Sequence, residues 1–340
     1  MTDDPLTYEA AGVSLDAAEA VVERIRAAVT STHRREVVGG PGGFAGLFAP
    51  SVGDPLLSAA CDGAGTKVLL GHAAGRYRGL GIDTVAMSAN DVITSGGRPV
   101  FFLDHITCGR IDPGVVGELV EGVAEGCRLA GCVLLGGETA EHPGMMEPEQ
   151  FDIAGFCVGV CERREMVTGA RIETGDTILG LPSSGPHSNG FSLIRKLIDR
   201  AGVGLDDTPP ELGGATVADA LLEPTAIYAS AVAELTRTVD VRAMAHITGG
   251  GIPGNLARQF RKGLGAEIDT GAWERQPVFG WLASLGVADD EMWRVFNMGL
   301  GFASVVVPES TDVALKALDR GGTPGFVAGR VIEGDGVTLR

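Results

Sequence analysis

The chain has 340 residues, of which 44% are apolar and 21% charged, so it holds enough apolar material for two globular domains. Its 44 acidic and 27 basic side chains give a formal charge of −17, and a negative field of that size excludes nucleic acids and anionic membranes as partners. An anionic small molecule would therefore need backbone N–H groups, a few basic side chains or metal ions to bind.

The start of the chain and its cysteines favour a cytoplasmic location. The first residues, Met-Thr-Asp-Asp-Pro, include neither the basic region nor the apolar stretch of a signal peptide. No apolar run elsewhere approaches the length of a membrane span. The six cysteines stand mostly among apolar neighbours, so we expect reduced thiols in the core and no disulfide framework.

The first half of the chain predicts alternating helices and strands. Apolar residues at helical spacing predict a helix over 16–29, and the glycine-rich stretch 39–46 is either a flexible connector or a mobile lid over a ligand. The clearest helix begins at Asp112, a good N-cap, followed by Pro113, and ends at Gly131. The other predicted elements here are a helix over 81–94, strands over 56–60, 100–107 and 151–161, and a short buried strand over 132–135.

A second alternating region follows a domain boundary. Charged and turn-prone residues over 162–175 indicate that boundary, so we divide the chain into domains 1–166 and 167–340. The second domain is predicted to contain strands over 176–181, 242–248, 300–307 and 326–332, and helices over 191–200 and 224–239. Mixed strands and helices in both halves predict an α/β or α+β fold.

The segment 62–67, Asp-Gly-Ala-Gly-Thr-Lys, has the features of a phosphate site. Gly63 and Gly65 let the backbone approach an anion, and Lys67 adds a positive charge. The segment is not a Walker A loop, because Gly-Lys-Ser/Thr never occurs in the chain. An ordinary turn after a strand is the alternative interpretation.

Carboxylates recur where predicted strands and loops meet, and these suit Mg²⁺, which takes a few carboxylates together with waters and phosphates. The set comprises Asp62, Asp83, Asp91, Asp104 and Glu138, with Asn90 next to Asp91 as a further oxygen donor. Helix caps and exposed charges are the alternative, since a chain with 44 acidic residues forms such clusters by chance.

Two further loops are candidates for ligand binding. The loop 183–190 gathers hydroxyls, His187 and an Asn before a helix start, where free N–H groups suit an anion, and His187 could bind phosphate or move a proton. A capped loop with a surface histidine is the alternative. The stretch 249–254 fits the dinucleotide pattern G-x-G-x-x-G, but Pro253 lies inside it and little room remains for a helix before Gly263, so a turn that packs or contacts substrate is favoured. Trp273, Trp281, Met292, Trp293 and Phe296 are assigned to packing.

Together these segments resemble the phosphoribosylformylglycinamidine cyclo-ligase family, also called aminoimidazole ribonucleotide synthetases, over almost the whole chain. The similar segments are Tyr8 with 11–13, 39–46, 62–67, 81–83, 90–91, 101–104, 136–141, 143–145, 154–156, 183–190, 246–251 and 296–299. The resemblance implies an N-terminal sheet domain that pairs with its copy in a homodimer to form a barrel-like sheet, and a C-terminal α/β domain. Nucleotide and substrate would lie between the domains, near the dimer interface.

The family's reaction uses ATP to phosphorylate the formyl oxygen of formylglycinamidine ribonucleotide, after which an amidine nitrogen closes the imidazole ring. The implied cofactors are ATP and Mg²⁺. The implied catalytic residues are His187, Asp91 and Lys67, and the metal ligands are Asp62, Asp91 and Glu138. ATP and its phosphates would contact Asp62, Gly63, Gly65, Thr66, Lys67, Asn90, Gly136, Gly137, Glu138 and Thr139. The substrate would contact Ser184, His187, Ser188, Asn189, Gly250 and Gly251.

The chain departs from the family at a few positions, most notably at Arg26, where the family commonly has Lys. Other readings remain open. One is another ATP-dependent enzyme of the same superfamily, such as thiamine-monophosphate kinase or selenophosphate synthetase, although the latter carries a reactive cysteine near its start and the first here is Cys61. The other is a non-catalytic nucleotide-binding protein.

Overall fold

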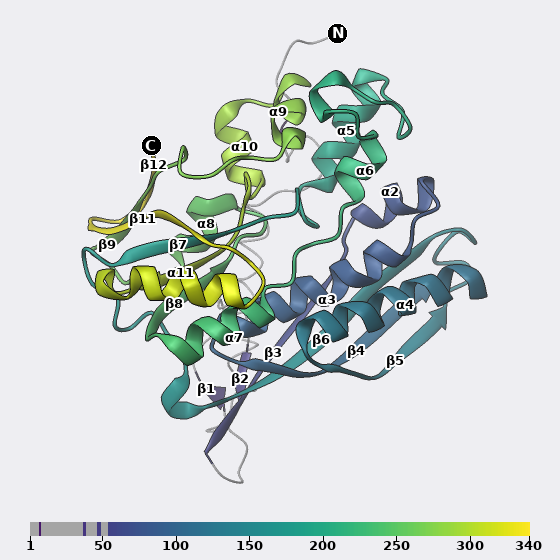
Figure 1. Ribbon diagram of the computed structural model, residues 1–340. Coiled ribbons are helices and arrows are strands. Elements are labelled where there is room, and N and C mark those ends of the chain that lie inside the picture. Colours follow the sequence, from purple (N-terminus) through teal and green to yellow (C-terminus); the bar gives the residue numbers. More distant parts are fainter. Residues whose placement is uncertain (1–6, 8–36, 39–45, 49–53) are drawn as a thin grey trace.

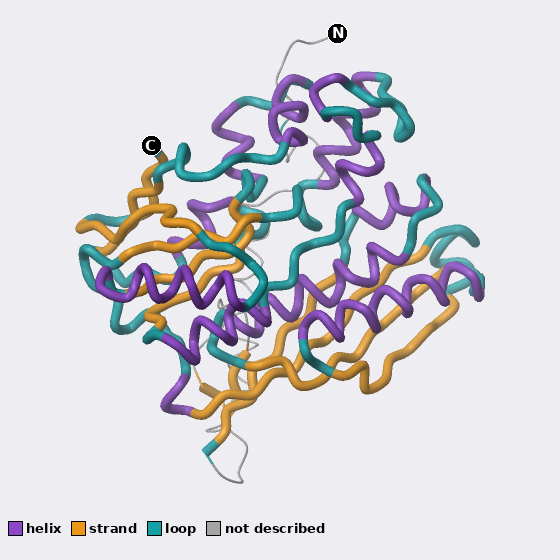
Figure 2. Tube along the Cα trace, viewed as in Figure 1, coloured by secondary structure: helices purple, strands orange, loops and turns teal. Residues whose placement is uncertain are grey.

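Two six-stranded sheets, one in each half of the chain, lie side by side in the computed structural model (Figures 1 and 2). The structure describes residues 7, 37–38, 46–48 and 54–340. The helix predicted over 16–29, Arg26 and the glycine-rich stretch before Gly46 lie outside the described residues.

Among the described residues, helices cover only one face of the first sheet, and the other face is called the uncovered face below. Its strands, in spatial order, are β1 (Val37–Val38), β2 (Gly46–Phe48), β3 (Pro55–Gly63), β6 (Phe151–Glu162), β4 (Arg98–Cys108) and β5 (Val133–Glu141). Only β4 and β5 pair in parallel. Alternate residues of β6, such as Ile153 and Cys157, are buried under α3 (Arg78–Ile93) and α4 (Pro113–Ala130), while Phe156 between them is exposed.

The two covering helices pack with their backbones in close contact. A Cβ atom at Gly81 of α3 would overlap the carbonyl of Leu119, and one at Gly122 of α4 would overlap the carbonyl of Arg78. The ends of α4 are those predicted: the Asp112 carboxylate accepts from the Gly114 N–H at 2.8 Å, and Gly131 has φ 70°. Glycine on both helices thus sets the distance of α3 from α4.

The prediction of a short buried strand over 132–135 is wrong in both length and burial. Strand β5 runs on to Glu141, so Gly136, Gly137, Glu138 and Thr139 lie in a strand and not in a loop. Val133 and Leu135 are 57% and 63% exposed. The reason is that β5 lies at the edge of the sheet, and no helix of the described residues covers Val133 and Leu135.

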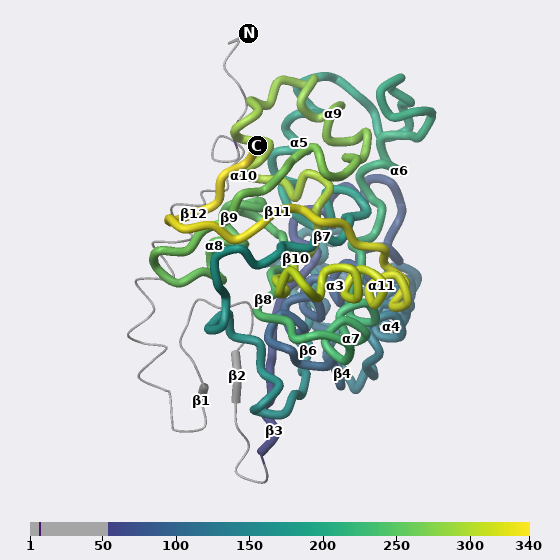
Figure 3. Tube along the Cα trace, turned by 60° about the vertical axis from the view of Figure 1, so that its left-hand side comes forward, coloured from purple at the N-terminus to yellow at the C-terminus, as the bar shows by residue number. Residues whose placement is uncertain are grey.

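The second sheet has helices on both faces and is almost wholly antiparallel. Its strands, in spatial order, are β12 (Gly336–Leu339), β9 (Leu264–Ile268), β11 (Phe326–Glu333), β7 (Thr177–Pro182), β10 (Leu300–Val306) and β8 (Val241–His246), so the C-terminal strand forms one edge (Figure 3). Apolar residues of α7 (Ala229–Thr238) and α11 (Thr311–Arg320) pack on one face, and those of α8 (Gly251–Ala257) on the other. The α/β (α+β) prediction is confirmed.

A separate group of helices with its own core lies beyond the second sheet, at the top of Figure 1. It contains α5 (Phe191–Ala201), α6 (Val217–Leu222), α9 (Pro277–Ser284) and α10 (Asp289–Val295), and short α2 (Lys67–Ala73) packs against it. Trp281, Met292 and Phe296 are buried in this core, which confirms their assignment to packing. One-turn 3₁₀ helices occupy Arg163–Glu165, Pro210–Leu212 and Pro308–Ser310.

The helix predicted over 224–239 begins only at Ala229. Residues 223–228 instead run without regular structure past α3, where the backbone N–H groups of Thr225 and Tyr228 donate to side chains of Asp83 and Asn90. Those hydrogen bonds replace helical ones, which is why the first part of that prediction is wrong.

All six cysteines are free thiols, and five of them are buried, which confirms the expectation of reduced core thiols for all except exposed Cys61. Within 54–340 and the shorter described stretches, no helix is long and apolar enough to span a membrane.

Candidate functional site

Segments from both halves of the chain meet at the boundary between the two sheets. They are the end of β3 with the turn to α2 (62–67), the loop before α5 (183–190), the extended segment 223–228 and the loop after β8 (247–250). Oγ1 of Thr66 lies 3.1 Å from Oγ of Ser192, and the Gly249 N–H donates to Oδ1 of Asn189 at 3.0 Å. The predicted phosphate segment and the predicted substrate loop are thus neighbours.

Two of the three predicted metal ligands lie close together beside a histidine. Asp91, in the last turn of α3, holds Nδ1 of His246 at 2.8 Å from its Oδ1, and His246 is buried at the end of β8. Burial raises the pKa of the Asp62 carboxyl above its ordinary value, and the nearby charge of Asp91 adds to the rise. Two neighbouring carboxylates offer the oxygen donors that a divalent cation prefers.

Glu138 does not join this pair within one chain. Along the first sheet, Asp62 pairs with Gly155, Gly155 with Asp104, and Asp104 with Gly137, so Glu138 lies three strands away, at a lateral distance of about 14 Å from the usual strand spacing. Glu138 is also one residue out of that row, and its side chain therefore points to the uncovered face. Among the described residues, no three His, Cys, Asp or Glu side chains form a group that could hold a metal ion.

Lys67 is buried, and its ammonium group contacts Asp83 and the Glu223 carbonyl. Nζ donates to Oδ1 of Asp83 at 3.0 Å and to the Glu223 carbonyl at 2.9 Å, and it lies 2.8 Å from Oδ2 of Asp83 in the ion pair. Two of the three donors of the ammonium group are thus used within the protein, and its charge is paired with a buried carboxylate. The direct phosphate contact expected of Lys67 stays a prediction, and it would require the buried ammonium group to turn from Asp83 towards the ligand.

The side chain of Asn90, which was also expected to contact ATP, is likewise hydrogen-bonded within the protein. Its amide donates to the Ala226 carbonyl at 2.8 Å and accepts from the Tyr228 N–H at 3.0 Å.

In the phosphate segment itself, Gly65 and Thr66 are exposed at the turn, whereas Gly63 packs against the Ile153 carbonyl inside the sheet.

His187 is a strained and buried histidine, which overturns the surface-histidine alternative. It has φ 59°, a left-handed conformation that is rare outside glycine, and its side chain has no exposed surface. Nε2 accepts from the Ser184 N–H at 3.2 Å, and Nδ1 has no partner in the described part of the chain. Burial, followed by the charges of His246 and Lys67, holds the pKa of His187 well below its ordinary value. The ring is therefore neutral, with its proton on the unpaired Nδ1.

Two further buried polar atoms near His187 have no partner within the described residues. Nδ2 of Asn189 is one, although Oδ1 of that amide accepts from Gly249. Nε2 of His246 is the other. Buried polar atoms without partners are rare, and a group of them at a domain boundary is typical of a ligand site. Sequence reasoning did not assign His246, although its place at the end of a strand before three glycines was a usable signal.

The remaining predicted substrate residues have structural contacts. Ser184 Oγ donates to the Pro224 carbonyl at 2.6 Å, and Ser188 Oγ lies 3.2 Å from Oγ1 of Thr225. Gly251 is buried, and a Cβ there would overlap the Trp293 carbonyl, so this glycine serves packing. Gly250 instead lines a cavity of about 620 Å³ on the C-terminal half.

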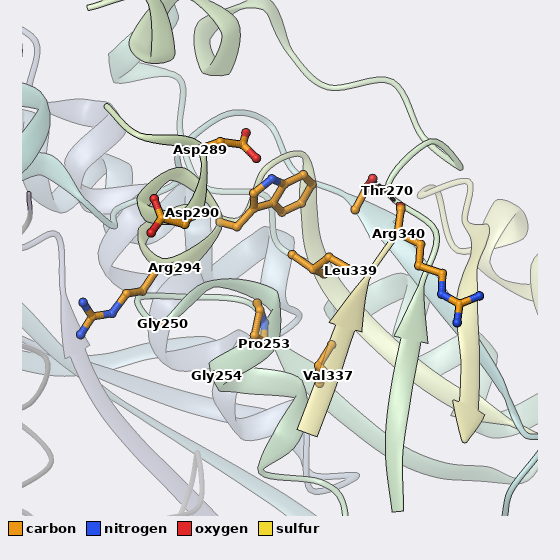
Figure 4. Close-up of a pocket in the computed structure, with 11 residues that line it drawn as sticks. Gly250, Pro253, Gly254, Thr270, Asp289, Asp290, Arg294, Val337, Leu339 and Arg340 are labelled. Atoms are coloured by element: carbon orange, nitrogen blue, oxygen red, sulfur yellow. Dashed lines mark hydrogen bonds between the residues drawn. The ribbon is translucent and has the colours of Figure 1, made fainter. Parts of the chain in front are cut away.

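That cavity is separate from the converging segments and shares only Gly250 with them. Asp289 and Asp290 lie on one side of it, and Val337, Leu339 and Arg340 on the other (Figure 4).

We expect the buried neutral state of His187 to make the free energy of unfolding depend on pH. The unfolded chain takes up this proton below about pH 6.5 and the folded chain does not, so stability is full above that pH and falls below it, by up to about 1.4 kcal/mol per pH unit. His187→Asn, which tolerates the left-handed backbone, should show a shallower fall between pH 7 and 5 in chemical denaturation. His72→Asn, at an exposed histidine, should match the wild type. Equal slopes for His187→Asn and wild type would contradict a buried neutral imidazole.

Comparisons with known proteins show the family to which the chain belongs. The AIR synthase related protein N-terminal domain matches residues 45–161, and the C-terminal domain of the same name matches 173–340. A phosphoribosylformylglycinamidine cyclo-ligase of Synechococcus sp. (strain RCC307) is 47% identical over 98% of both chains. One of Myxococcus xanthus (strain DK1622) is 49% identical over 97% of both. The chain belongs to the phosphoribosylformylglycinamidine cyclo-ligase family.

Solved structures show that the cyclo-ligase fold extends to enzymes of low sequence identity. Thiamine-monophosphate kinase from Stenotrophomonas maltophilia K279a has a TM-score of 0.63 at 18% identity, covering 94% of this chain and 95% of its own. A structure of AaThiL complexed with AMPPCP and TMP has a TM-score of 0.66 at 17% identity, covering 96% and 95%. At these identities the likeness concerns the fold alone.

Membership of the cyclo-ligase family decides between the interpretations left open by the sequence. The chain is a ligase of purine biosynthesis by family. This assignment argues against dinucleotide binding at 249–254 and against thiamine-monophosphate kinase activity. Each predicted domain, 1–166 and 167–340, contains one family domain, while the position of the boundary itself stays a prediction.

Proposed function

We propose that this protein uses ATP to close the imidazole ring of aminoimidazole ribonucleotide in purine synthesis. The γ-phosphoryl group would pass to the formyl oxygen of formylglycinamidine ribonucleotide with release of ADP. An amidine nitrogen then attacks that carbon, and phosphate and a proton leave. The observation that carries the proposal is identity of 47–49% over nearly the full length to relatives named for this activity.

We assign Mg²⁺ to Asp62 and Asp91. Both offer hard oxygen donors, and the charge of Asp91 lies near enough to Asp62 to add to the rise in its pKa that burial causes, so one ion could contact both carboxylates. When bound, the ion would neutralise charge on the transferring phosphoryl group. The roles predicted for Gly136, Gly137, Glu138 and Thr139 stay predictions, because these residues lie on the uncovered side and edge of the first sheet.

His187 and Asn189 are suited to donate hydrogen bonds to oxygen atoms of the substrate. The Nδ1–H group of neutral His187 and the Nδ2 group of Asn189 are donors without partners in the described structure. Donors held in place before the reaction would stabilise negative charge on the oxygens of the transferring phosphoryl group, and on the oxygen that leaves with phosphate at ring closure. Ring closure is intramolecular, so a site that holds the substrate folded supplies much of the rate.

We further propose a homodimer formed through the uncovered face of the first sheet. Leu135 and Phe156, at 63% and 47% exposure, lie on this face together with Cys61, and Val133 stands at the edge strand. Exposed apolar side chains on a sheet without a covering layer are typical of an interface between chains. Six thiols without disulfides also suit the reducing cytoplasm, where we place the protein.

Leu135→Glu should convert the dimer to a monomer, because it places a charge in the proposed apolar interface. Sedimentation velocity would measure the species present. Val313→Glu is the matched control, since Val313 is an exposed apolar residue on α11, at 47%, and should leave the dimer intact. A wild-type protein that sediments as a monomer at micromolar concentration would refute the interface.

The direct test of the function is an assay with purified protein, formylglycinamidine ribonucleotide, Mg²⁺ and ATP. Aminoimidazole ribonucleotide and ADP should appear in equal amounts. Thiamine monophosphate as sole acceptor should yield no ADP above background. A folded protein that forms no aminoimidazole product, or that phosphorylates thiamine monophosphate, would overturn the proposal.

A further inference from the structure

A buried ion pair joins the two halves of the chain beside the candidate site. Lys67 and Asp83 have no exposed side-chain surface, and both oxygens of Asp83 lie within 3.0 Å of Nζ. Nζ of Lys67 also donates to the carbonyl of Glu223, which belongs to the other half of the chain. The ion pair therefore also binds the segment that begins at Glu223, which is distant from both residues in the sequence.

Segment 223–228 is held at two points by α3. Oδ1 of Asp83 accepts from the backbone N–H and from Oγ1 of Thr225, at 2.7 and 2.6 Å. Asn90, seven residues or two turns further along the same side of α3, holds the Ala226 carbonyl and the Tyr228 N–H. Such hydrogen bonds to buried charged or amide groups are costly to leave unmade.

The same segment holds the loop that carries His187. Ser184 Oγ donates to the carbonyl of Pro224, and the Ser188 hydroxyl meets that of Thr225 at 3.2 Å. Thr225 gives its proton to Asp83, so the Ser188 hydroxyl donates to Thr225. Tyr228 Oη donates to the Pro182 carbonyl at 2.9 Å. A continuous path of hydrogen bonds thus runs from the Lys67–Asp83 pair to both sides of His187.

We propose that the Lys67–Asp83 ion pair is a positioning device that fixes loop 183–190 through Thr225, and that Lys67 does not bind phosphate. The inference rests on the proposed function only in those tests that measure enzyme activity. Lys67 and Asp83 are accordingly positioning residues and not catalytic ones.

A double substitution separates positioning from phosphate binding. Lys67→Met or Asp83→Asn alone leaves one buried charge without its partner, which is strongly destabilising, whereas removing both charges leaves a neutral pair. We expect each single variant to lose at least about 10-fold in kcat and the Lys67→Met/Asp83→Asn double variant to recover at least about 10-fold over Lys67→Met. A double variant as stable as the wild type but no more active than Lys67→Met would overturn the proposal.

Thr225→Val provides a test in which the ion pair is left intact. It removes the hydroxyl that links Asp83 to Ser188. The expected result is a fall in kcat of about 10-fold, with KM for ATP within about 2-fold of the wild type. Thr236→Val, at a hydroxyl that only bonds carbonyls of its own helix α7, is the matched control and should keep both constants. A rise in KM for ATP with unchanged kcat would contradict positioning.

Hydrogen exchange separates a failure of this inference from a failure of the proposed function. The peptide covering 183–190 should exchange faster in Thr225→Val than in wild type and Thr236→Val, whether or not the wild type closes the ring. Unchanged protection of that peptide would refute the link from Asp83 to the loop. Absence of wild-type activity together with faster exchange would refute the function and retain the link.

Discussion

Asp91→Asn is expected to lower kcat about 10²–10³-fold, because it removes a negative charge from the proposed Mg²⁺ site. The substitution keeps an oxygen that can accept from Nδ1 of His246, which lies 2.8 Å from Oδ1 in the wild type, so the histidine should stay in place. The Mg²⁺ concentration needed for half-maximal activity should rise in the same variant. Steady-state kinetics at several Mg²⁺ concentrations would measure both changes.

Asp112→Asn is the matched control for Asp91→Asn. It makes the same chemical change at the N-cap of α4, and asparagine caps helices about as well as aspartate. The control should keep the wild-type kcat and Mg²⁺ dependence. Near-normal turnover in Asp91→Asn at low Mg²⁺ concentration would remove Asp91 from the metal site.

Gly301→Ala should reduce both stability and activity. Gly301 lies at an irregular position of β10, and an added Cβ would overlap Oη of Tyr228 and lie 2.6 Å from Cε1 of His187. Both side chains are fully buried and have no room to move, so we expect a loss of about 1–3 kcal/mol in the free energy of unfolding. Displacement of His187 should also lower kcat. Chemical denaturation and the ring-closure assay would measure the two effects.

Gly280→Ala is the control for Gly301→Ala. Gly280 lies in α9 with open space around its Cβ position, so alanine should keep activity and stabilise the protein by up to about 1 kcal/mol. If Gly301→Ala were as stable and as active as the wild type, the tight packing of His187 against β10 would be refuted.

Elements with strong local signals were predictable from the sequence, and those shaped by distant contacts were not. Helix α4 carries its own start and stop residues, Asp112 and Gly131, and its bounds were predicted closely. Segment 223–228 has apolar and helix-forming residues, but its backbone groups bond to Asp83 and Asn90 more than a hundred residues away. No local pattern reports such a partner.

The candidate site shows the same division. The loop containing His187 was predictable because its polar residues stand between a strand and a helix. The engagement of Lys67 was not, because a lysine after glycines has the same local sequence whether its partner is a phosphate or the buried carboxylate of Asp83. Glu138 was grouped with Asp62 because both carboxylates stand where a predicted strand meets a loop and the family resemblance implies metal binding. Only the strand register shows that the two side chains lie on opposite faces of the sheet.

The contact between α3 and α4 limits how this protein can diverge. Gly81 and Gly122 touch the backbone of the opposite helix, so any larger residue at either position would push α3 outward and carry Asp83 and Asp91 with it. Gly117 of α4 has open space around it and carries no such restriction. Substitutions should therefore be tolerated at Gly117 and rejected at Gly122, five residues further along α4, although neither glycine belongs to the candidate site.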